Sequence, residues 1–403
     1  MRPYRLGFMR DSSRLSATLL ALLGCLSATV PAAADFDDCL ASMRGEAIAA
    51  GVSAATFDSA TRGLTPNDAG GFLDNQPEFT TPVWDYLAGL VDEDRITDGR
   101  ARLRQHAAPL ASAEKLYGVD RATVVAVWGV ESDYGRAIGK RPLIQSLATL
   151  SCEGRRQAYF RTELFAAMKI IQSGDVAASA LIGSWAGAFG QTQFMPSTFL
   201  RFAVDPDGDG RRDVVGSVPD ALGSTANYLR SSGWQPGLVW GFEVTVPKDY
   251  SGPTGRKPKQ PMTFWAGLGV RRVDGKPLGT GSAGLIQPAG SEGPAFLVTS
   301  NFDAIFTYNA SVAYALAIAH LSDRLRGGGP FVTPWPTDDM GLSRSERREL
   351  QGLLSQRGYD IGPADGAIGE KTRQAIADVQ TKAGLPLDGR PGTKLLNMLR
   401  LGQ

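Results

Sequence analysis

Residues 127–135 read VWGVESDYG, and this stretch brings one carboxylate, that of Glu131, to the end of an apolar helical run. The run follows Asp120, whose side chain suits an N-cap, and it stops at the turn-forming Ser-Asp-Tyr-Gly. Apolar surroundings disfavour a charged carboxylate, so we expect them to raise the pKa of Glu131. A carboxylic acid that is protonated near neutral pH can donate its proton to a leaving-group oxygen. The alternative is a glutamate that only caps the helix end or forms an ion pair there.

A second stretch, residues 183–199, reads GSWAGAFGQTQFMPSTF and combines small residues with amide and aromatic side chains. Small residues let a backbone approach a ligand closely. Gln193 and Ser197 can form hydrogen bonds with sugar hydroxyl or acetamido groups. Three rings offer flat apolar faces for sugars: Trp185, Phe189 and Phe194. The alternative is close helix packing in which these rings belong to the core.

The loop 205–213 reads DPDGDGRRD and matches the start of an EF-hand calcium loop. Gly210 permits the sharp turn that such a loop needs. The match then fails, because Gly216 stands where the bidentate glutamate belongs; Asp213 and Asp220 are the available substitutes. The pattern predicts a cation site with a structural rather than a catalytic role, and the alternative is an acidic loop that holds no specific ion.

Helical patterns dominate the chain as far as about residue 235, over 36–50, 96–117, 121–131, 159–171 and 219–230. Gly and Pro then become frequent, and β-rich runs such as 242–246 and 296–299 predict a small β-containing insertion between about 238 and 300. A helix returns at 311–325. Tyr308 and Asn309, just before it, are candidates for lining a cleft, although an asparagine at this place also suits a cap.

The segment 327–340 is rich in Gly and Pro and reads as a linker, whose reach and stiffness its composition leaves open. Residues 341–403 then form a compact module of three short helices. Ser343 and Glu346 fit a capping box. The pattern Asp-Gly-x-x-Gly occurs at 365–369 and again at 388–392, which indicates a weak internal repeat.

Composition excludes several classes of function. The 403 residues are 43% hydrophobic and 21% charged, which is typical of globular proteins, and they suffice for more than one core. The formal net charge of +1 gives no electrostatic basis for binding nucleic acid. With only two histidines, His106 and His320, neither a histidine-based metal site nor a Ser-His triad is favoured.

The first 34 residues are typical of a secretory signal. Four arginines precede the apolar run 15–30, and Ala32-Ala33-Ala34 suits cleavage, which predicts an exported, periplasmic product. The alternatives are a membrane anchor and an outer-membrane lipoprotein attached through Cys25. Cleavage leaves Cys39 and Cys152, and an even pair in an oxidising compartment suggests a disulfide. The alternative is two buried thiols.

Taken together and in this order, the motifs resemble the lytic murein transglycosylase B family over about residues 36–325, and 341–403 is similar to the peptidoglycan-binding domain of wall enzymes. The resemblance implies a mainly α (α+β) fold: a lysozyme-like helical catalytic domain over 35–326 with a small β-containing insertion, followed by the linker and a three-helix peptidoglycan-binding module. It also implies cleavage of the β-1,4 bond between N-acetylmuramic acid and N-acetylglucosamine without hydrolysis. Glycan strands of peptidoglycan are then the partner, with no cofactor needed for the chemistry.

The resemblance also assigns residues, with Glu131 matching the catalytic glutamate of the family. The matching cleft positions are Gln193, Ser197, Tyr228, Tyr308 and Asn309, and the basic pair Arg155-Arg156 matches residues that can meet the acidic peptide stem. The matching calcium-site region comprises Asp205, Asp207, Asp209 and Asp220, with Arg211 contributing a carbonyl. Two departures are Phe189, where methionine is commoner, and a calcium loop one residue longer, which puts ion affinity in doubt.

One carboxylate sets the mechanism that we expect. Most glycosidases use two, and here Asp133 is the only second acid close in sequence and is expected to point elsewhere. Glu131 would protonate the glycosidic oxygen and then, as a carboxylate, accept the proton of the 6-hydroxyl, which closes 1,6-anhydromuramic acid. The alternatives are a lysozyme-type hydrolase and a non-catalytic wall-binding protein. We expect a monomer that can associate with other cell-wall enzymes.

Overall fold

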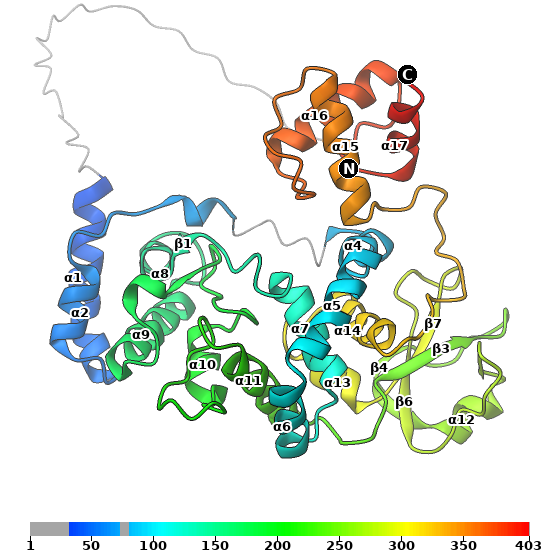
Figure 1. Ribbon diagram of the computed structural model, residues 1–403, viewed down its shortest axis with the longest axis horizontal. Helices are drawn as coiled ribbons and strands as arrows, with labels where there is room; N and C mark the ends of the chain where they lie inside the picture. The colour runs from blue at the N-terminus through cyan, green and yellow to red at the C-terminus, as the bar shows by residue number, and fades with distance from the viewer. Residues whose placement is uncertain (1–31, 73–79, 403) are drawn as a thin grey trace, which may run out of the picture.

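A computed structural model describes residues 32–72 and 80–402. The predicted signal segment, including Cys25, lies outside the described residues except for Ala32-Ala33-Ala34, which begin the first helix. Figure 1 shows a group of N-terminal helices on one side, a central set of helices, a small sheet on the other side, and a C-terminal helical module beyond the central set. The expected mainly helical fold with a small β-containing part is confirmed.

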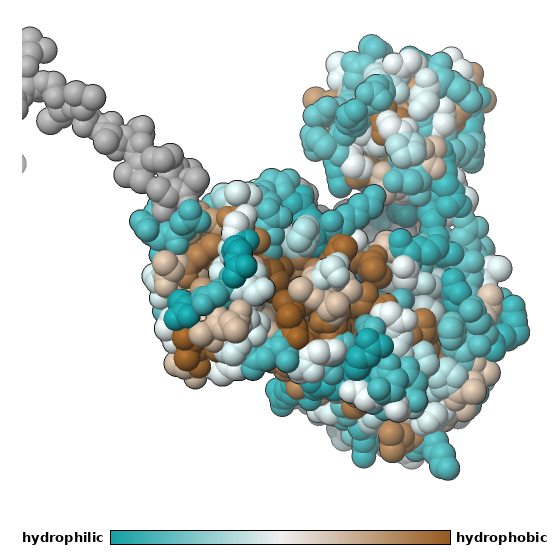
Figure 2. All heavy atoms as spheres, turned by 60° about the vertical axis from the view of Figure 1, so that its left-hand side comes forward, coloured by the Kyte–Doolittle hydropathy of each residue, from teal (hydrophilic) through white to brown (hydrophobic). Residues whose placement is uncertain are grey.

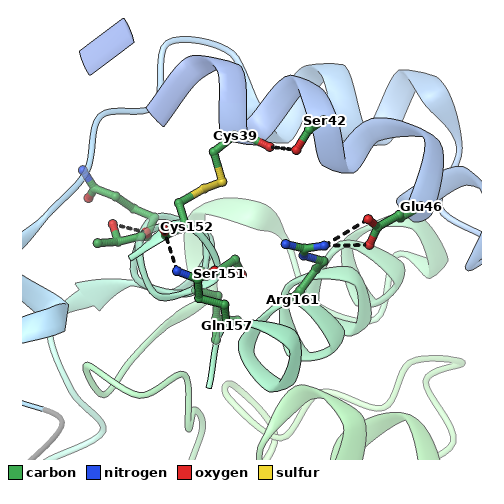
Figure 3. Close-up of a disulfide and its surroundings, with 10 residues drawn as sticks. Cys39, Ser42, Glu46, Ser151, Cys152, Gln157 and Arg161 are labelled. Carbon is green, nitrogen blue, oxygen red and sulfur yellow. Dashed lines mark hydrogen bonds and ion pairs between the residues drawn. A yellow bond between two sulfur atoms is a disulfide. The ribbon is translucent and has the colours of Figure 1, made fainter. Parts of the chain in front are cut away.

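The N-terminal helices pack around one core with the helices that carry the disulfide. The core residues include Phe36, Met43, Leu147 and Leu164. Cys39 and Cys152 form a disulfide that spans 113 residues of chain (Figure 3). The elements of this region are α1 (Ala32–Ala49), α2 (Ala54–Thr61), η1 (Asp68–Phe72), β1 (Arg141–Pro142), α8 (Leu143–Cys152), α9 (Gln157–Ser173), η2 (Ala178–Ala180), β2 (Ile182–Gly183) and α10 (Pro196–Phe202).

The central helices surround α7 (Arg121–Ser132), which is buried along nearly its whole length. Asp120 caps it, because its carboxylate accepts a hydrogen bond from the backbone N–H of Thr123 at 2.9 Å. The neighbouring helices are α4 (Val83–Leu90), α5 (Glu93–Gln105), α6 (Ala107–Tyr117), α11 (Val218–Ser231), α13 (Ser300–Phe306) and α14 (Val312–Leu325).

The prediction of one helix over 96–117 is wrong. The helix is interrupted at His106, which is the C-cap of α5 and the N-cap of α6. The reason is Pro109, which has no N–H and whose ring would clash with the carbonyl of Gln105 in a continuous helix. The predicted end is confirmed, since Gly118 takes the left-handed conformation at φ 67°.

The β-containing part is a five-stranded antiparallel sheet in the order β4-β6-β7-β3-β5. Trp265 and Val270 pack with Leu285 and Leu297 in a core of its own. Its elements are β3 (Gly241–Thr245), β4 (Gly255–Pro261), α12 (Met262–Gly267), β5 (Arg271–Arg272), β6 (Ser282–Ile286) and β7 (Ala295–Val298).

The C-terminal module consists of α15 (Arg344–Gln356), α16 (Glu370–Ala383) and α17 (Thr393–Arg400) around a small leucine-rich core. The predicted capping box of Ser343 and Glu346 is confirmed. The segment before the module is held in place: the buried carboxylate of Glu243 accepts hydrogen bonds from the backbone N–H groups of Val332 and Thr333, both at 2.7 Å.

Within 32–72 and 80–402, every helix is too short or too polar to cross a bilayer.

Candidate active site

Glu131 lies in the last turn of α7 and is half-buried. The hydroxyl of Tyr314, from α14, donates a hydrogen bond to its Oε1. Tyr314 is itself buried in the central core, so the helix packing that fixes its ring also fixes this donor. The carboxylate of Glu131 is therefore held from one side by a group 183 residues further along the chain.

Tyr314 belongs to a row of three tyrosines. Its ring stacks on that of Tyr308 at 6.3 Å, and the Tyr308 ring meets Tyr228 edge-on at 4.8 Å. Burial, reinforced by the negative charge of Glu131, raises the pKa of both Tyr308 and Tyr314 well above the ordinary value. Both hydroxyls therefore stay protonated and act as hydrogen-bond donors: Tyr308 donates to the carbonyl of Thr192 at 2.9 Å.

Gln191 fixes the end of α7 to the stretch 183–199. The indole Nε1 of Trp128 donates to its Oε1 at 3.0 Å, and its Nε2 donates to the carbonyl of Val215 at 3.0 Å. The hydroxyl of Ser132, the residue after Glu131, donates to the backbone carbonyl of Gln191. Hydrogen bonds of Gln191 thus connect the two stretches that the sequence analysis identified, 127–135 and 183–199, next to the carboxylate of Glu131.

The structure gives Gln193 and Ser197 partners within the protein. Gln193 has φ 52°, and its Nε2 donates to the carbonyls of Ile138 and Gly190 at 3.1 and 2.8 Å. Ser197 donates through its Oγ and its backbone N to the carboxylate of Glu163, at 2.6 and 2.9 Å. Both residues therefore shape the loop and the start of α10, whatever they contribute to binding.

The aromatic residues of the same stretch divide into two groups. Phe189 and Phe194 are 0% and 1% exposed and belong to the core, which bears out the alternative interpretation for these two rings. Trp185 is half-buried against that core. Of the three candidates for stacking on sugars, only its ring keeps exposed surface for a ligand.

Asp133 does not serve as a second carboxylate beside Glu131. It is the C-cap of α7 at φ 52° and is bound by Arg95, Arg136 and Arg344. Burial alone would raise its pKa, but the hydrogen bond from Arg136 and the charges of Arg95 and Arg344 outweigh burial and hold the pKa of Asp133 below its usual range. Asp133 is thus held as an anion in ion pairs; the sequence led us to expect only that its side chain points elsewhere.

Three further candidates lie on loops. Arg155 and Arg156 are exposed between α8 and α9, next to the disulfide, and the Arg156 guanidinium stacks on the ring of Tyr159 at 4.4 Å. Asn309 is half-buried in the turn before α14, but the cap of that helix is Ser311, which accepts from the backbone N–H of Tyr314. The cap interpretation of Asn309 is therefore wrong, and the residue remains a candidate for lining the cleft.

A cavity of about 860 Å³ opens beside the start of α14, two residues before Tyr314. Its walls come from segments 80–84, 286–290 and 312–313, with Pro336 from the linker. Figure 2 shows hydrophobic residues gathered near the middle of one face, with hydrophilic residues on both sides. The residues that line this cavity include neither Glu131 nor any of the predicted cleft positions, so the cavity is not the catalytic site itself.

The acidic loop brings three carboxylates together. One oxygen each of Asp205, Asp207 and Asp209 lie within 4.8 Å of one another. Asp220 contributes a buried oxygen, Oδ1, that has no hydrogen-bond partner in the described part of the chain. Burial, with the charges of Asp207 and Asp205, raises the pKa of Asp220 to about 6. Three clustered carboxylates suit a hard cation such as Ca²⁺, but Asp220 is not among the three whose oxygens lie within 4.8 Å of one another, and the side chain of Arg211 competes for Asp209 at 3.0 Å.

Sequence reasoning missed Tyr314 and Gln191. Gln191 stood inside a quoted stretch, but its neighbours Gln193 and Ser197 drew attention as polar candidates. Tyr314 lies on the helical face of 311–325, where an aromatic residue reads as core. The contact of Tyr314 with Glu131 and that of Gln191 with Trp128 join residues far apart in the sequence, so no local sequence pattern indicates them.

Comparison with known proteins assigns both parts of the chain. Residues 35–323 match the family model described as Transglycosylase SLT domain, and 343–399 match the one described as Putative peptidoglycan binding domain. Membrane-bound lytic murein transglycosylase B of Escherichia coli strain K12 is 32% identical over 253 residues, which is 59% of this chain. The match spans 65% of the length of that relative.

Solved structures agree with this assignment. SltB3 from Pseudomonas aeruginosa, in complex with NAG-anhNAM-pentapeptide, is 49% identical and superposes with a TM-score of 0.73 over 91% of this chain and 99% of its own. Escherichia coli Slt35 in complex with calcium is 28% identical, with a TM-score of 0.63 over 73% of this chain and 93% of its own.

Proposed function

Because the chain belongs to the SLT transglycosylase family and carries a peptidoglycan-binding domain, we propose that it is a lytic transglycosylase that cleaves the glycan strands of peptidoglycan. The observation that carries the proposal is the position of Glu131, half-buried and held by Tyr314, while Asp133 is taken up by three arginines. The complex of the 49% identical SltB3 with an anhydro-muramic ligand supports it.

In the proposed mechanism Glu131 acts first as acid and then as base. Its proton goes to the glycosidic oxygen between N-acetylmuramic acid and N-acetylglucosamine. The bond between that oxygen and the anomeric carbon of the muramic acid breaks, N-acetylglucosamine leaves with the proton on its 4-hydroxyl, and the acetamido group of the muramic acid stabilises the developing cation. Glu131, now a carboxylate, accepts the proton of the 6-hydroxyl of the same sugar. That oxygen bonds to the anomeric carbon and gives 1,6-anhydromuramic acid, so the residue ends the cycle protonated. Tyr314 keeps the carboxyl oriented through both transfers.

A single carboxylate is enough because the substrate supplies both nucleophiles. Retaining and inverting glycosidases need a second carboxylate facing the first, and Asp133 is held away in ion pairs with Arg95, Arg136 and Arg344. A water molecule in place of the 6-hydroxyl would give hydrolysis instead. The identity of the new chain end therefore separates the two activities.

The remaining substrate contacts are proposals at the residue level. We propose that Tyr228, Tyr308 and Asn309 line the cleft, and that Gln193 and Ser197 contact the glycan from the loop before α10. Arg155 and Arg156 are exposed cations that can meet the acidic peptide stem. We further propose a catalytic domain over 35–326, a linker over 327–340 and a peptidoglycan-binding domain over 341–403. The protein is exported to the periplasm and cleaved after Ala34, or lipidated at Cys25. It is a monomer that associates with other wall enzymes.

Digestion of purified peptidoglycan, with products identified by mass spectrometry, tests the activity. We expect anhydro-terminated muropeptides from the wild type and from the control Glu292→Gln, an exposed glutamate in the turn before β7. Glu131→Gln should lose activity by at least about a hundredfold, since it can neither donate nor accept the proton. Reducing ends from the wild type would identify a hydrolase. No product from any variant, with wall binding retained, would mean a non-catalytic binding protein.

We also propose that the acidic loop holds a structural Ca²⁺ through Asp205, Asp207, Asp209 and Asp220, with the carbonyl of Arg211. The unsatisfied Oδ1 of Asp220 supports this. Thermal unfolding after chelation and readdition tests it: Ca²⁺ should raise the melting temperature of the wild type and should not affect Asp220→Asn. An equal response to Mg²⁺, or a response that persists in Asp220→Asn, would contradict a specific calcium site.

A further inference from the structure

The C-terminal module binds the catalytic helices through arginines of α15. Nη1 and Nη2 of Arg344 donate to Oδ2 and Oδ1 of Asp133 at 2.9 and 2.7 Å. One turn further along, Arg348 donates to Asp94 at 2.6 Å. Of these two contacts, the first reaches the segment that carries Glu131, because Asp133 follows that residue by two positions.

The two ion pairs differ in their shielding from water. The side chains of Arg344 and Asp133 are 12% and 18% exposed, whereas those of Arg348 and Asp94 are 41% and 43% exposed. A bidentate ion pair between a guanidinium and a carboxylate that is shielded from water has a fixed geometry. Exposed pairs are screened by salt and contribute little. The ion pair at Asp133 is thus better fixed than the one at Asp94. A second shielded pair joins Arg390 of the module to Asp85 of α4, with side chains 22% and 11% exposed, so the contact at Asp133 is not what holds the module in place by itself.

The backbone at this point needs outside support. Asp133 and Tyr134 take φ values of 52° and 59°, in the left-handed region that residues other than glycine seldom occupy. Such a turn persists only where neighbouring contacts hold it. Within the catalytic domain, Tyr134 donates to the carbonyl of Arg95 at 2.8 Å, and Arg136 and Arg95 both form ion pairs with Asp133. Arg344 adds a support that comes from the other domain.

Glu131 therefore lies between two points of attachment. On the side of the loop 183–199, Trp128 and Ser132 are bound to Gln191. On the side of the C-terminal module, Asp133 is bound to Arg344. A shift of the second attachment would rotate or fray the last turn of α7 and move the carboxyl relative to Tyr314.

We propose that Arg344 is a positioning residue for Glu131, so that the wall-binding domain is also part of the catalytic apparatus. The inference rests on the proposed function of Glu131. It predicts that loss of the bidentate ion pair between Arg344 and Asp133 lowers kcat without weakening the binding of substrate. The reason is that Arg344 acts on the position of Glu131 and does not contact the glycan.

The test uses the full-length chain with soluble, uncrosslinked glycan strands, and compares kcat and KM for Arg344→Gln and for the matched control Arg348→Gln. We expect kcat to fall about tenfold in Arg344→Gln, as small misplacements of a catalytic group do, with KM and wall binding unchanged. Arg344→Lys keeps the charge without the bidentate pair and should be intermediate. In an Asp133→Asn background, Arg344→Gln should cause no further loss.

Hydrogen exchange of the segment 128–136 provides a readout that does not depend on activity. We expect faster exchange there in Arg344→Gln than in Arg348→Gln, with the rest of the catalytic domain unchanged. Wild-type kcat and exchange in Arg344→Gln, or equal losses in both variants, would overturn the proposal. If the wild type itself forms no product, the proposed function fails, and the exchange data alone decide whether Arg344 positions the end of α7.

Discussion

At the scale of single residues, Gly129 shows how closely the last turn of α7, which carries Glu131, is packed. A Cβ built on it would lie 2.7 Å from both Cζ and Oη of Tyr134, whose ring folds back over the helix. Tyr134 is 3% exposed and its hydroxyl is bound to Arg95, so the ring cannot give way. The close approach of this ring, rather than backbone freedom, requires glycine two residues before Glu131.

Gly129→Ala should therefore destabilise the protein by about 1–3 kcal/mol through overpacking, and should lower activity by displacing Glu131. Gly45→Ala is the matched control, because Gly45 also lies in a helix but, apart from its own helix backbone and chain neighbours, no described atom lies within 4 Å of the added carbon. It should be neutral or stabilising by up to about 1 kcal/mol. Urea unfolding and the peptidoglycan assay measure both, and equal effects of the two substitutions would contradict this account.

Residue-scale prediction worked where the signal was local. Asp120 precedes an apolar run and caps it, and Glu131 ends the same run, so both follow from the stretch itself. Tyr314 and Gln191 lie 183 and 63 residues from the groups that they bind. Contacts over such distances are set by how helices pack, which one sequence read locally does not contain.

At the scale of elements, periodicity found the helices, and single residues decided where they break. The apolar pattern continues across His106, but Pro109 stops the helix there, so one predicted element became α5 and α6. The disulfide between Cys39 and Cys152 joins the start of the described chain to the end of α8. Cysteine count suggested this pair, whereas its geometry depends on how α1 packs on α8 and α9.

The two Asp-Gly turns of the C-terminal module repeat in structure as well as in sequence. The backbone N–H of Gly366 donates to Gln351 Oε1 at 2.7 Å, and that of Gly389 donates to Gln380 Oε1 at 2.9 Å. Each glutamine is buried and comes from the helix before its turn. The sequence showed the turns but not these partners, because their spacing differs: 15 residues in the first case and 9 in the second.

At the scale of the whole molecule, the linker departs most from what its composition suggests. Gly and Pro predicted an irregular segment and left its stiffness open. The segment is irregular, yet Glu243 binds its backbone at Val332 and Thr333, and Phe331 stacks on His320 at 3.8 Å. The composition of this segment shows that it lacks a helical pattern. It cannot show that side chains elsewhere in the chain hold the segment in place. The linker between the catalytic and peptidoglycan-binding domains is thus anchored to the catalytic domain at its start, at residues 331–333.

His320 makes the stability of this arrangement dependent on pH. Burial, and then the charge of Arg324, lower its pKa from 6.5 to about 3, so the imidazole is neutral in the folded protein. Between these values the unfolded chain binds a proton that the folded chain does not, and stability falls as the pH decreases, by about 1.4 kcal/mol per unit. From about pH 6.5 to about pH 5 the loss should reach about 2 kcal/mol.

His320→Phe removes this titration and keeps a ring against Phe331. Urea unfolding of both proteins at about pH 7 and about pH 5 gives the difference between the two profiles, in which contributions shared by both proteins, such as that of Asp220, cancel. His106→Asn is the control for the other histidine, whose pKa burial also lowers but which is only half-buried. If the wild type and His320→Phe lose equal stability between the two pH values, His320 is not the group responsible, and the linker contact does not set the acid sensitivity of the molecule.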